Sequence, residues 1–168
     1  MRIAITGKIA SGKSYISHYL CDTYNFKIFS FAQPIKKICN DIFNMKGKDR
    51  LLLQEFSEKC KELDKDVWVK YLDEAISNET GNIVIDDMRF PNEWEMLTLH
   101  GFTIIKLTLP PELQLQRIKE TYPDTYKKHL ERLNHISESS YEYLPYDYTI
   151  DVSNGDVLNN INKILKFI

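Results

Sequence analysis

Short runs of apolar residues alternate along the chain with longer segments in which apolar side chains recur every three or four positions. The short runs have the form of buried β-strands, and they lie at residues 2–6, 26–31, 82–87, 102–107 and 146–152. The longer segments have helical spacing, and they lie at residues 14–20, 35–43, 51–56, 67–72, 92–100, 111–118 and 157–165. Because strands that alternate with helices specify a parallel sheet covered on both sides, the pattern predicts an α/β fold with a parallel five-stranded sheet.

Two segments depart from this alternation. Residues from about 32 to 80 hold only helical patterns, which predicts a helical insert between the second and third strands. Residues 122–143 are polar, aromatic and charged, a composition that makes a poor core. The helix before them carries three apolar residues that we expect to be buried: Leu113, Leu115 and Ile118. The 168 residues are enough for one domain with a core that needs no disulfides.

The loop between the first strand and the first helix has a phosphate-binding sequence. Residues 7–14, Gly-Lys-Ile-Ala-Ser-Gly-Lys-Ser, fit the P-loop pattern G-x-x-x-x-G-K-[ST]. The glycines let backbone N–H groups turn inward around a phosphate chain, Lys13 reaches the outer phosphates, and the Ser14 hydroxyl binds Mg²⁺. The alternative is a glycine-rich turn that holds no phosphate. The expected nucleotide contacts are Gly7, Lys8, Ala10, Ser11, Gly12, Lys13, Ser14 and Tyr15.

Composition narrows the class of partner. The 22 Lys and Arg residues are balanced by 24 Asp and Glu residues, so the chain lacks the broad basic surface typical of nucleic-acid binding. Its three cysteines lack C-x-x-C spacing, which indicates neither a disulfide framework nor a zinc site. No apolar run has the length of a transmembrane helix, and the chain enters a strand too early for a signal peptide. We expect a cytoplasmic protein without a nucleic-acid or membrane partner.

The rest of the chain discriminates among the classes of P-loop protein. A GTPase would usually carry N-K-x-D and D-x-x-G motifs, and the sequence has neither. A motor ATPase needs partner surfaces and more chain. A small-molecule kinase needs a sheet, an acceptor-binding helical insert and a basic lid late in the chain, and the predicted elements come in that order. Phosphoryl transfer depends on positioning and charge neutralisation, so cations from several segments must converge on the phosphate.

Four further stretches have distinctive sequences. Residues 31–36 are Phe-Ala-Gln-Pro-Ile-Lys, 87–93 are Asp-Met-Arg-Phe-Pro-Asn-Glu, 135–138 are His-Ile-Ser-Glu, and 147–150 are Asp-Tyr-Thr-Ile before the turn Asn154-Gly155. Together with the P-loop, they resemble the deoxynucleoside monophosphate kinases of bacteriophages and large DNA viruses, whose motifs include F-A-D-P-L-K, D-x-R-F-P-N-E and H-x-S-E. Gln33 stands where that family has an acid.

This resemblance implies a P-loop NTPase three-layer sandwich with a helical acceptor-binding insert and a lid, all within one kinase domain, 1–168. It also implies transfer of the γ-phosphoryl group of ATP to a deoxynucleoside monophosphate, with Mg²⁺, in the host cytoplasm if the chain is viral. Two other functions stay open. One is a P-loop kinase of another phosphorylated metabolite, such as phosphomevalonate or dephospho-coenzyme A. The other is a regulatory ATP-binding module that uses hydrolysis as a switch. A homodimer, the preferred base and the exclusion of ribonucleotides are open as well.

The acidic stretch after the third predicted strand carries the expected acceptor chemistry. Asp86 and Asp87 could order Mg²⁺, with Asp86 as the metal-site candidate, or polarise the acceptor phosphate; the alternatives are a helix cap or an ion pair with Arg89. By resemblance, Asp87 is the better catalytic candidate. The planar guanidinium of Arg89 could hold the acceptor phosphate through two parallel hydrogen bonds, which makes Arg89 both a substrate-binding and a catalytic candidate.

The insert and the lid supply the remaining candidates. In the insert we expect acceptor contacts from Phe31, Gln33, Lys36 and Trp68, although Lys36 could be a solvated surface lysine and Trp68 a core residue. The lid is placed at about 117–140, with an ordinary polar helical hairpin as its alternative. Arg117 resembles the arginine that opens the lid helix in small kinases and covers the phosphates of ATP. Lys127, Lys128 and Arg132 are weaker candidates as lid cations, since charge runs are most often solvated faces. His135 and Glu138 are expected to tie the lid down by hydrogen bonds, Glu138 also to contact the acceptor, and Asn154 to contact the nucleotide.

Overall fold

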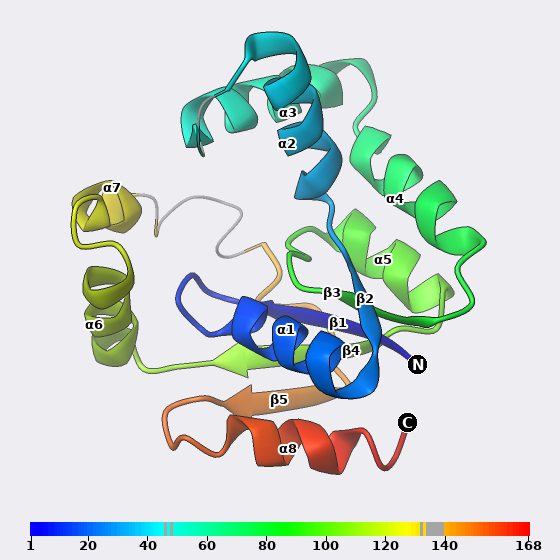
Figure 1. The fold of residues 1–168 in the computed structure, drawn as a ribbon, viewed down its shortest axis with the longest axis vertical. Helices are drawn as coiled ribbons and strands as arrows, with labels where there is room; N and C mark the ends of the chain where they lie inside the picture. The colour runs from blue at the N-terminus through cyan, green and yellow to red at the C-terminus, as the bar shows by residue number, and fades with distance from the viewer. Residues whose placement is uncertain (46, 48, 132, 134–139) are drawn as a thin grey trace. The chain divides into compact units, whose positions relative to one another are not determined.

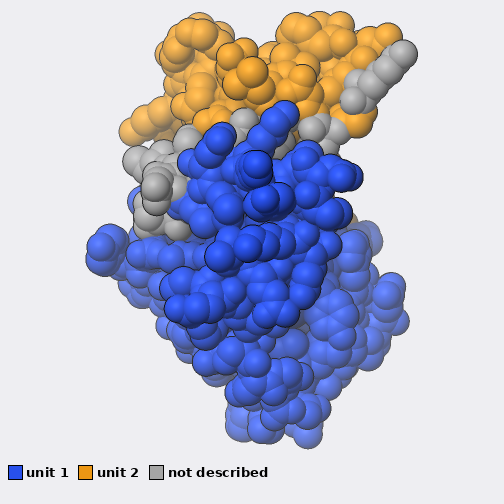
Figure 2. Space-filling view, turned by 90° about the vertical axis from the view of Figure 1, so that its left-hand side faces the viewer, with its two compact units in different colours: residues 1–28, 81–168 blue, residues 29–80 orange. Residues whose placement is uncertain are grey.

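The computed structural model describes residues 1–45, 47, 49–131, 133 and 140–168. The chain forms two compact units, drawn in blue and orange in Figure 2. The sheet unit comprises residues 1–28 and 81–168, and the insert unit comprises residues 29–80. Each unit has a hydrophobic core of its own.

The sheet unit is built on five strands (Figure 1). They are β1 (Arg2–Gly7), β2 (Phe26–Phe29), β3 (Asn82–Ile85), β4 (Thr103–Thr108) and β5 (Tyr148–Asp151). Their order across the sheet is β2-β3-β1-β4-β5, and β1 pairs in parallel with both β3 and β4. The predicted α/β fold with a five-stranded parallel sheet is therefore confirmed. In this order the loops that follow β1 and β3 leave neighbouring strands at the same edge of the sheet.

Helices cover both faces of this sheet. The helices described in this unit are α1 (Lys13–Tyr24), α5 (Pro91–Leu99), α6 (Pro111–Thr121), α7 (Tyr126–Glu131) and α8 (Val157–Ile164), of which α6 and α7 lie beyond the end of β4 (Figure 1). The side chains of Ile3 and Ile5 pack in one core cluster with Ile16 of α1 and Ile161 of α8. Successive residues of a strand point to opposite faces, and on the other face Thr6 Oγ1 donates a hydrogen bond to the Met88 carbonyl, in the loop before α5.

The described residues of the insert unit form three helices in succession: α2 (Ala32–Phe43), α3 (Arg50–Leu63) and α4 (Val67–Ser77). Its core centres on Ile35, Cys39 and Trp68. The Asp49 carboxylate begins α3 by accepting hydrogen bonds from the next N–H groups of the helix, a standard N-cap. Along the described parts of the chain, no helix is both long enough and apolar enough to cross a membrane.

Two predictions about burial in the sheet unit are wrong in part. In α6, Ile118 is fully buried but Leu115 is 37% exposed, and the polar Gln114 is buried instead. In the segment predicted to be a poor core, Tyr141 and His129 are 1% and 6% exposed. The aromatic residues of this segment contribute to the interior, where the ring of Tyr122 stacks on that of His129 at 4.1 Å between centroids.

Candidate active site

The P-loop makes a tight corner between β1 and α1. Gly7 has φ +146°, and a Cβ atom there would lie 2.7 Å from the Leu107 carbonyl oxygen and 2.9 Å from Ser11 Oγ. Both distances are shorter than real Cβ contacts allow, so only glycine fits this position. Gly12, with φ +92°, occupies the N-cap of α1. The two glycines thus bring the backbone close to itself at the start of the loop and turn it into the helix at the end.

The middle of the loop combines backbone strain with a buried hydroxyl. Ala10 has φ +64°, in the left-handed region that residues with a Cβ rarely adopt. The N–H of Ser11 donates to the Lys8 carbonyl at 3.2 Å and closes the turn. The side chain of Ser11 is 1% exposed, and its hydroxyl has no hydrogen-bond partner among the residues that the structure describes. Buried polar groups are normally satisfied, so this loop has spare hydrogen-bonding capacity for a polar ligand.

Lys13 lies across the loop at the beginning of α1. Its ammonium donates hydrogen bonds to the Gly7 carbonyl at 2.6 Å and to the Lys8 carbonyl at 2.9 Å. The first N–H groups of a helix and its dipole favour an anion at this end. The Ser14 side chain follows in the exposed first turn. A cation, a helix N-terminus and inward-turned amides are what a chain of phosphates requires.

Asp86 lies beside the first turn of α1. Ser17 Oγ is 2.9 Å from Asp86 Oδ2 and 3.1 Å from the Ser14 carbonyl oxygen, so one hydroxyl links the end of β3 to the turn that carries Ser14. The Asp86 carboxylate and the Ser14 hydroxyl, whose segments are joined through Ser17, are hard oxygen groups of the kind that Mg²⁺ prefers. Burial raises the pKa of Cys21, one turn further along α1, and the charges of Asp22 and Asp86 raise it further.

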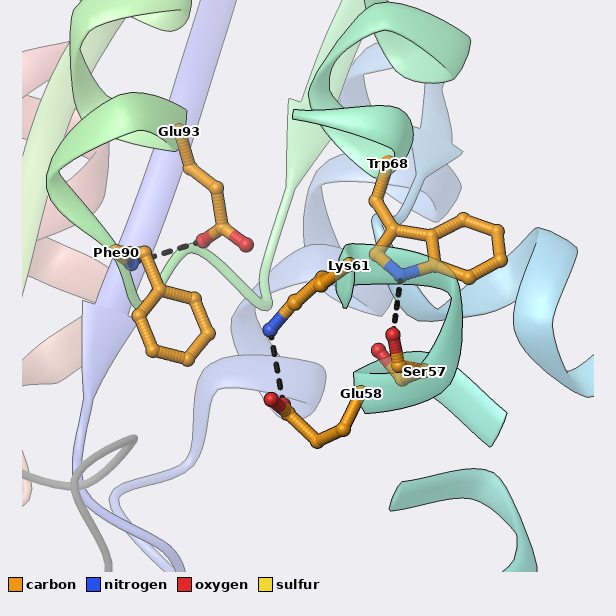
Figure 3. A network of polar contacts seen from close by, with 6 residues as sticks. All are labelled: Ser57, Glu58, Lys61, Trp68, Phe90 and Glu93. Carbon is orange, nitrogen blue, oxygen red and sulfur yellow. Dashed lines mark hydrogen bonds and ion pairs between the residues drawn. The ribbon is translucent and has the colours of Figure 1, made fainter. Parts of the chain in front are cut away.

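The loop of residues 87–90, which we call the Arg89 loop, is fixed through its backbone. The Glu93 carboxylate accepts hydrogen bonds from the N–H groups of Arg89 at 2.6 Å and Phe90 at 3.0 Å, the second of which is drawn in Figure 3. Ser140 Oγ donates to the Arg89 carbonyl at 2.5 Å. Both peptide groups that flank the Arg89 Cα are therefore held by hydrogen bonds, and this fixes the direction of its Cα–Cβ bond.

Two segments from late in the chain reach the P-loop. Gln114 Nε2 donates to the Ile9 carbonyl at 3.2 Å, and Arg117 donates through Nη1 to the Ala10 carbonyl at 3.5 Å and through Nη2 to the Val152 carbonyl at 3.0 Å. Glu142 forms an ion pair with Lys8 at 3.4 Å. Arg117 therefore lies beside the P-loop, and its contact with phosphate stays a prediction.

A second cation lies behind this ion pair. Lys106 Nζ donates to the Glu142 carbonyl at 3.2 Å and lies 5.0 Å from the centre of the Tyr146 ring. Burial, together with the charge of Glu142, raises the pKa of Tyr146 to about 12. The hydroxyl of Tyr146 has no hydrogen-bond partner within the described residues.

The structure brings one group of the predicted residues together and leaves others apart. Hydrogen bonds link the P-loop segment to Asp86 through Ser17 and to Arg117 through the Ala10 carbonyl. Asp87 and Arg89 lie in the loop after β3, the strand that pairs with β1. Tyr15 is 60% exposed on α1, and Asn154 is exposed after β5. The predicted lid includes α7 and its exposed Lys127 and Lys128, while Arg132, His135 and Glu138 fall outside the described residues.

The predicted residues of the insert divide by burial. Phe31 and Trp68 are 4% and 7% exposed, whereas Gln33 and Lys36 are exposed. Trp68 Nε1 donates to the Ser57 carbonyl at 3.5 Å (Figure 3), and its ring lies 6.3 Å from that of Phe56. These contacts favour the core alternative for Trp68 over stacking on an acceptor base.

Five residues with a role in the geometry were missed by the sequence analysis: Ser17, Glu93, Gln114, Ser140 and Glu142. Only Glu93 has a local signal, because a proline at the first position of a helix followed by a glutamate at the third is typical of a helix start. Each of the other four contacts a partner that is far away in the sequence, and no spacing rule predicts such a contact.

Comparison with known proteins agrees with this geometry. A family model described as an AAA domain matches residues 3–143. A relative from Acanthamoeba polyphaga mimivirus, named "Putative deoxynucleotide monophosphate kinase", is 26% identical over 160 residues, covering 70% of this chain and 83% of the relative.

Two solved structures share the fold. The shikimate kinase from Acinetobacter baumannii in complex with shikimate has a TM-score of 0.64 at 18% identity, covering 99% of this chain and 91% of that one. A gluconokinase from Sinorhizobium meliloti 1021 has a TM-score of 0.55 at 12% identity, covering 99% of this chain and 95% of that one. At these identities, the two structures establish the fold alone.

Proposed function

The chain belongs to the AAA-domain family and has the fold of P-loop small-molecule kinases, and from this premise we propose that it is a deoxynucleoside monophosphate kinase. It would transfer the γ-phosphoryl group of ATP to a deoxynucleoside monophosphate and release ADP and the diphosphate. The observation that carries the proposal is the position of the Arg89 loop. An arginine with a fixed backbone follows the strand next to the one that leads into the P-loop. The name of the viral relative supports the same acceptor class.

The P-loop would bind the phosphates of ATP. Gly7 leaves room for a close backbone approach, Ser11 offers a buried hydroxyl, and the ammonium of Lys13 would neutralise charge that develops during transfer. Ser14 and Asp86 would hold Mg²⁺, which when bound draws charge from the phosphate oxygens. Arg117 would add positive charge from α6.

The Arg89 loop would hold the acceptor. The guanidinium of Arg89 can take two oxygens of a monophosphate at once, and Asp87 would orient or polarise the same group. An oxygen of the acceptor phosphate forms a bond to the γ-phosphorus, and the bond from that phosphorus to the bridging oxygen breaks, so ADP leaves. A general base is not needed, because the acceptor is already an ionised phosphate.

A panel of acceptors with ATP and Mg²⁺ tests this function. We expect turnover with one or more deoxynucleoside monophosphates to exceed turnover with dephospho-coenzyme A, phosphomevalonate, shikimate and gluconate. A higher rate with one of these other acceptors would replace the proposed substrate class. ATP hydrolysis without acceptor that equals the best acceptor-stimulated rate would overturn the kinase proposal and favour a switch module.

The Arg89→Lys variant tests the assigned role within the same assay. Lysine keeps the charge but cannot make two parallel hydrogen bonds, so the acceptor KM should rise about tenfold or more while the ATP KM changes little. A raised ATP KM with an unchanged acceptor KM would assign Arg89 to the nucleotide.

A further inference from the structure

Two consecutive peptide groups of the P-loop are held by one helix. Gln114 donates to the carbonyl of Ile9, and Arg117 donates to the carbonyl of Ala10. Residues three apart in a helix lie on the same face, so both side chains extend from the side of α6 that meets the loop. Figure 1 shows α6 beside the loop that joins β1 to α1. The two carbonyls belong to the peptide groups on either side of Ala10.

Ala10 is the residue whose backbone needs such support. Its φ of +64° is disfavoured by contact between the Cβ and the following carbonyl oxygen, and such conformations persist only where the surroundings fix them. In a planar trans peptide, the C=O and the following N–H point in opposite directions. A hydrogen bond from Gln114 to the Ile9 carbonyl therefore also fixes the direction of the Ala10 N–H, one of the amides of the phosphate-binding loop.

The burial of Gln114 indicates that the hydrogen bond is the reason for the residue type. Its side chain is 5% exposed, while the neighbouring Leu115 is 37% exposed. An amide buried without a hydrogen bond is unfavourable compared with an apolar side chain of the same size. Gln116, two residues further on, shows the ordinary surface alternative, since it is exposed and donates to Glu120 at 2.8 Å.

We propose that Gln114 is a positioning residue for nucleotide binding, which acts through the Ile9 carbonyl to keep Ala10 left-handed and the loop amides directed at the phosphates. The inference goes beyond the proposed function and rests on it only in taking the P-loop as the ATP site. It requires that loss of the Gln114 donor weakens ATP binding without affecting the acceptor.

The first test compares Gln114→Met, which keeps the length and removes the donor, with the matched control Gln116→Met. The dissociation constant of ATP with Mg²⁺ is measured by titration calorimetry on proteins checked for an unchanged far-UV spectrum. We expect about a tenfold rise for Gln114→Met, the effect of one lost hydrogen bond, and less than a twofold change for the control. A folded Gln114→Met protein with the wild-type constant would overturn the proposal.

The Gln114→Glu variant gives a second readout and serves if the methionine variant does not fold. An ionised carboxylate cannot donate to the Ile9 carbonyl, but a protonated one can. Burial at this position raises the pKa of the introduced carboxyl above its ordinary value of about 4.3. Relative to the wild type at each pH, the ATP affinity of Gln114→Glu should therefore recover as the pH falls from about 8 to about 5. Affinity that stays equally weak over this range would contradict a role through the donor.

Strain at Ala10 supplies the third test. Glycine tolerates a φ of +64°, so Gln114→Met should weaken ATP binding less in the Ala10→Gly background than in the wild type. Equal losses in the two backgrounds would indicate simple packing and overturn the proposal. These binding measurements stand apart from the acceptor panel. A protein that binds ATP but phosphorylates no deoxynucleoside monophosphate would refute the proposed function and leave the role of Gln114 decided by its dissociation constants.

Discussion

The sheet unit and the insert unit are held by different kinds of contact. In the sheet unit, strand partners are far apart along the chain: Arg2 pairs with Ile83, and Ile3 pairs with Thr103. In the insert unit, the core comes from one continuous stretch, and ion pairs join neighbours such as Lys59 with Glu62 and Lys70 with Asp64. A hydrogen bond from Lys70 lowers the pKa of Asp64, but such exposed pairs stabilise little.

This difference indicates that the two units differ in how rigidly their residues are held. Long-range contacts hold the P-loop in position, whereas we expect the small core of the insert unit to open at a lower free energy. Substitutions in the two units should therefore separate chemistry from stability.

Lys13→Ala should lower kcat by about a thousandfold, because it removes a cation that stabilises charge in the transition state. Lys13 is partly exposed and lies outside the hydrophobic cores, so the midpoint of thermal unfolding should change little. Lys119→Ala on the exposed side of α6 is the matched control and should keep kcat within twofold. Near-normal kcat in Lys13→Ala with every acceptor would show that the P-loop is not the catalytic site.

Trp68→Ala should lower the stability of the insert unit and leave the sheet unit unchanged. Loss of a large side chain that is 7% exposed should destabilise the insert unit by about 3–5 kcal/mol. Hydrogen exchange measured by mass spectrometry should accelerate across residues 29–80 and stay slow in β1, β3 and β4. Trp68→Phe should give a smaller acceleration. Equal acceleration in both units would mean that they unfold as one cooperative body and that the insert unit has no separate, lower opening free energy.

Glu93→Gln should change the Arg89 loop without affecting the P-loop. An amide oxygen accepts hydrogen bonds more weakly than a carboxylate, so the N–H groups of Arg89 and Phe90 lose support worth about 1 kcal/mol. Steady-state kinetics should show the acceptor KM raised several-fold and the ATP KM unchanged. Glu95→Gln, at an exposed position of the same helix, is the control. An equal rise in both constants would mean that Glu93 supports the whole site and not this loop.

Tyr146→Phe should have the smallest effect at neutral pH, since the hydroxyl has no partner among the described residues. The pKa of Tyr146 is raised to about 12, so the folded protein keeps a proton that the unfolded chain releases near the ordinary value of about 10. Stability from this group is complete below pH 10 and is lost as the pH rises towards 12, by at most about 1–2 kcal/mol after allowance for partial exposure.

Urea unfolding at pH 9 and at pH 11 measures this loss. The difference between the two should be smaller in Tyr146→Phe than in the wild type, and Tyr143→Phe, at a position that is 94% exposed, should behave like the wild type. The same pH dependence in all three proteins would show that the pKa of Tyr146 does not differ between the folded and unfolded chains.

Local features of the sequence were enough to predict the sheet and the P-loop. The run Ile83-Val84-Ile85 is fully buried as a parallel strand must be, and the strand, loop and helix around Gly7 and Lys13 follow the motif. Even here the strand ends depend on distant residues. β5 begins at Tyr148 rather than Tyr146, because Asp147 bonds to Ile104 through its carboxylate and its N–H.

Non-local contacts explain what periodicity failed to predict. The spacing of Leu115 predicts a core residue, but Gln114 is buried instead because it donates a hydrogen bond to the Ile9 carbonyl. Ile9 lies 105 residues earlier, so no local pattern predicts this contact. Tyr141 lies in a polar segment and is nevertheless buried. Neither the apolar spacing nor the composition of a segment predicts which distant part of the chain it will pack against. The burial of these residues is therefore seen only in the folded chain.

The central place of β1 in the sheet has a consequence for synthesis on the ribosome. β1 and the P-loop leave the exit tunnel before both neighbours of β1, and the side chains that hold Ile9 and Ala10 come later still. The helices of residues 29–80 can pair as they emerge, since their partners are close in sequence. Nascent chains that end before β4 therefore carry the whole P-loop motif without the partners that hold its backbone, and a segment made before those partners should be among the last to take its final shape.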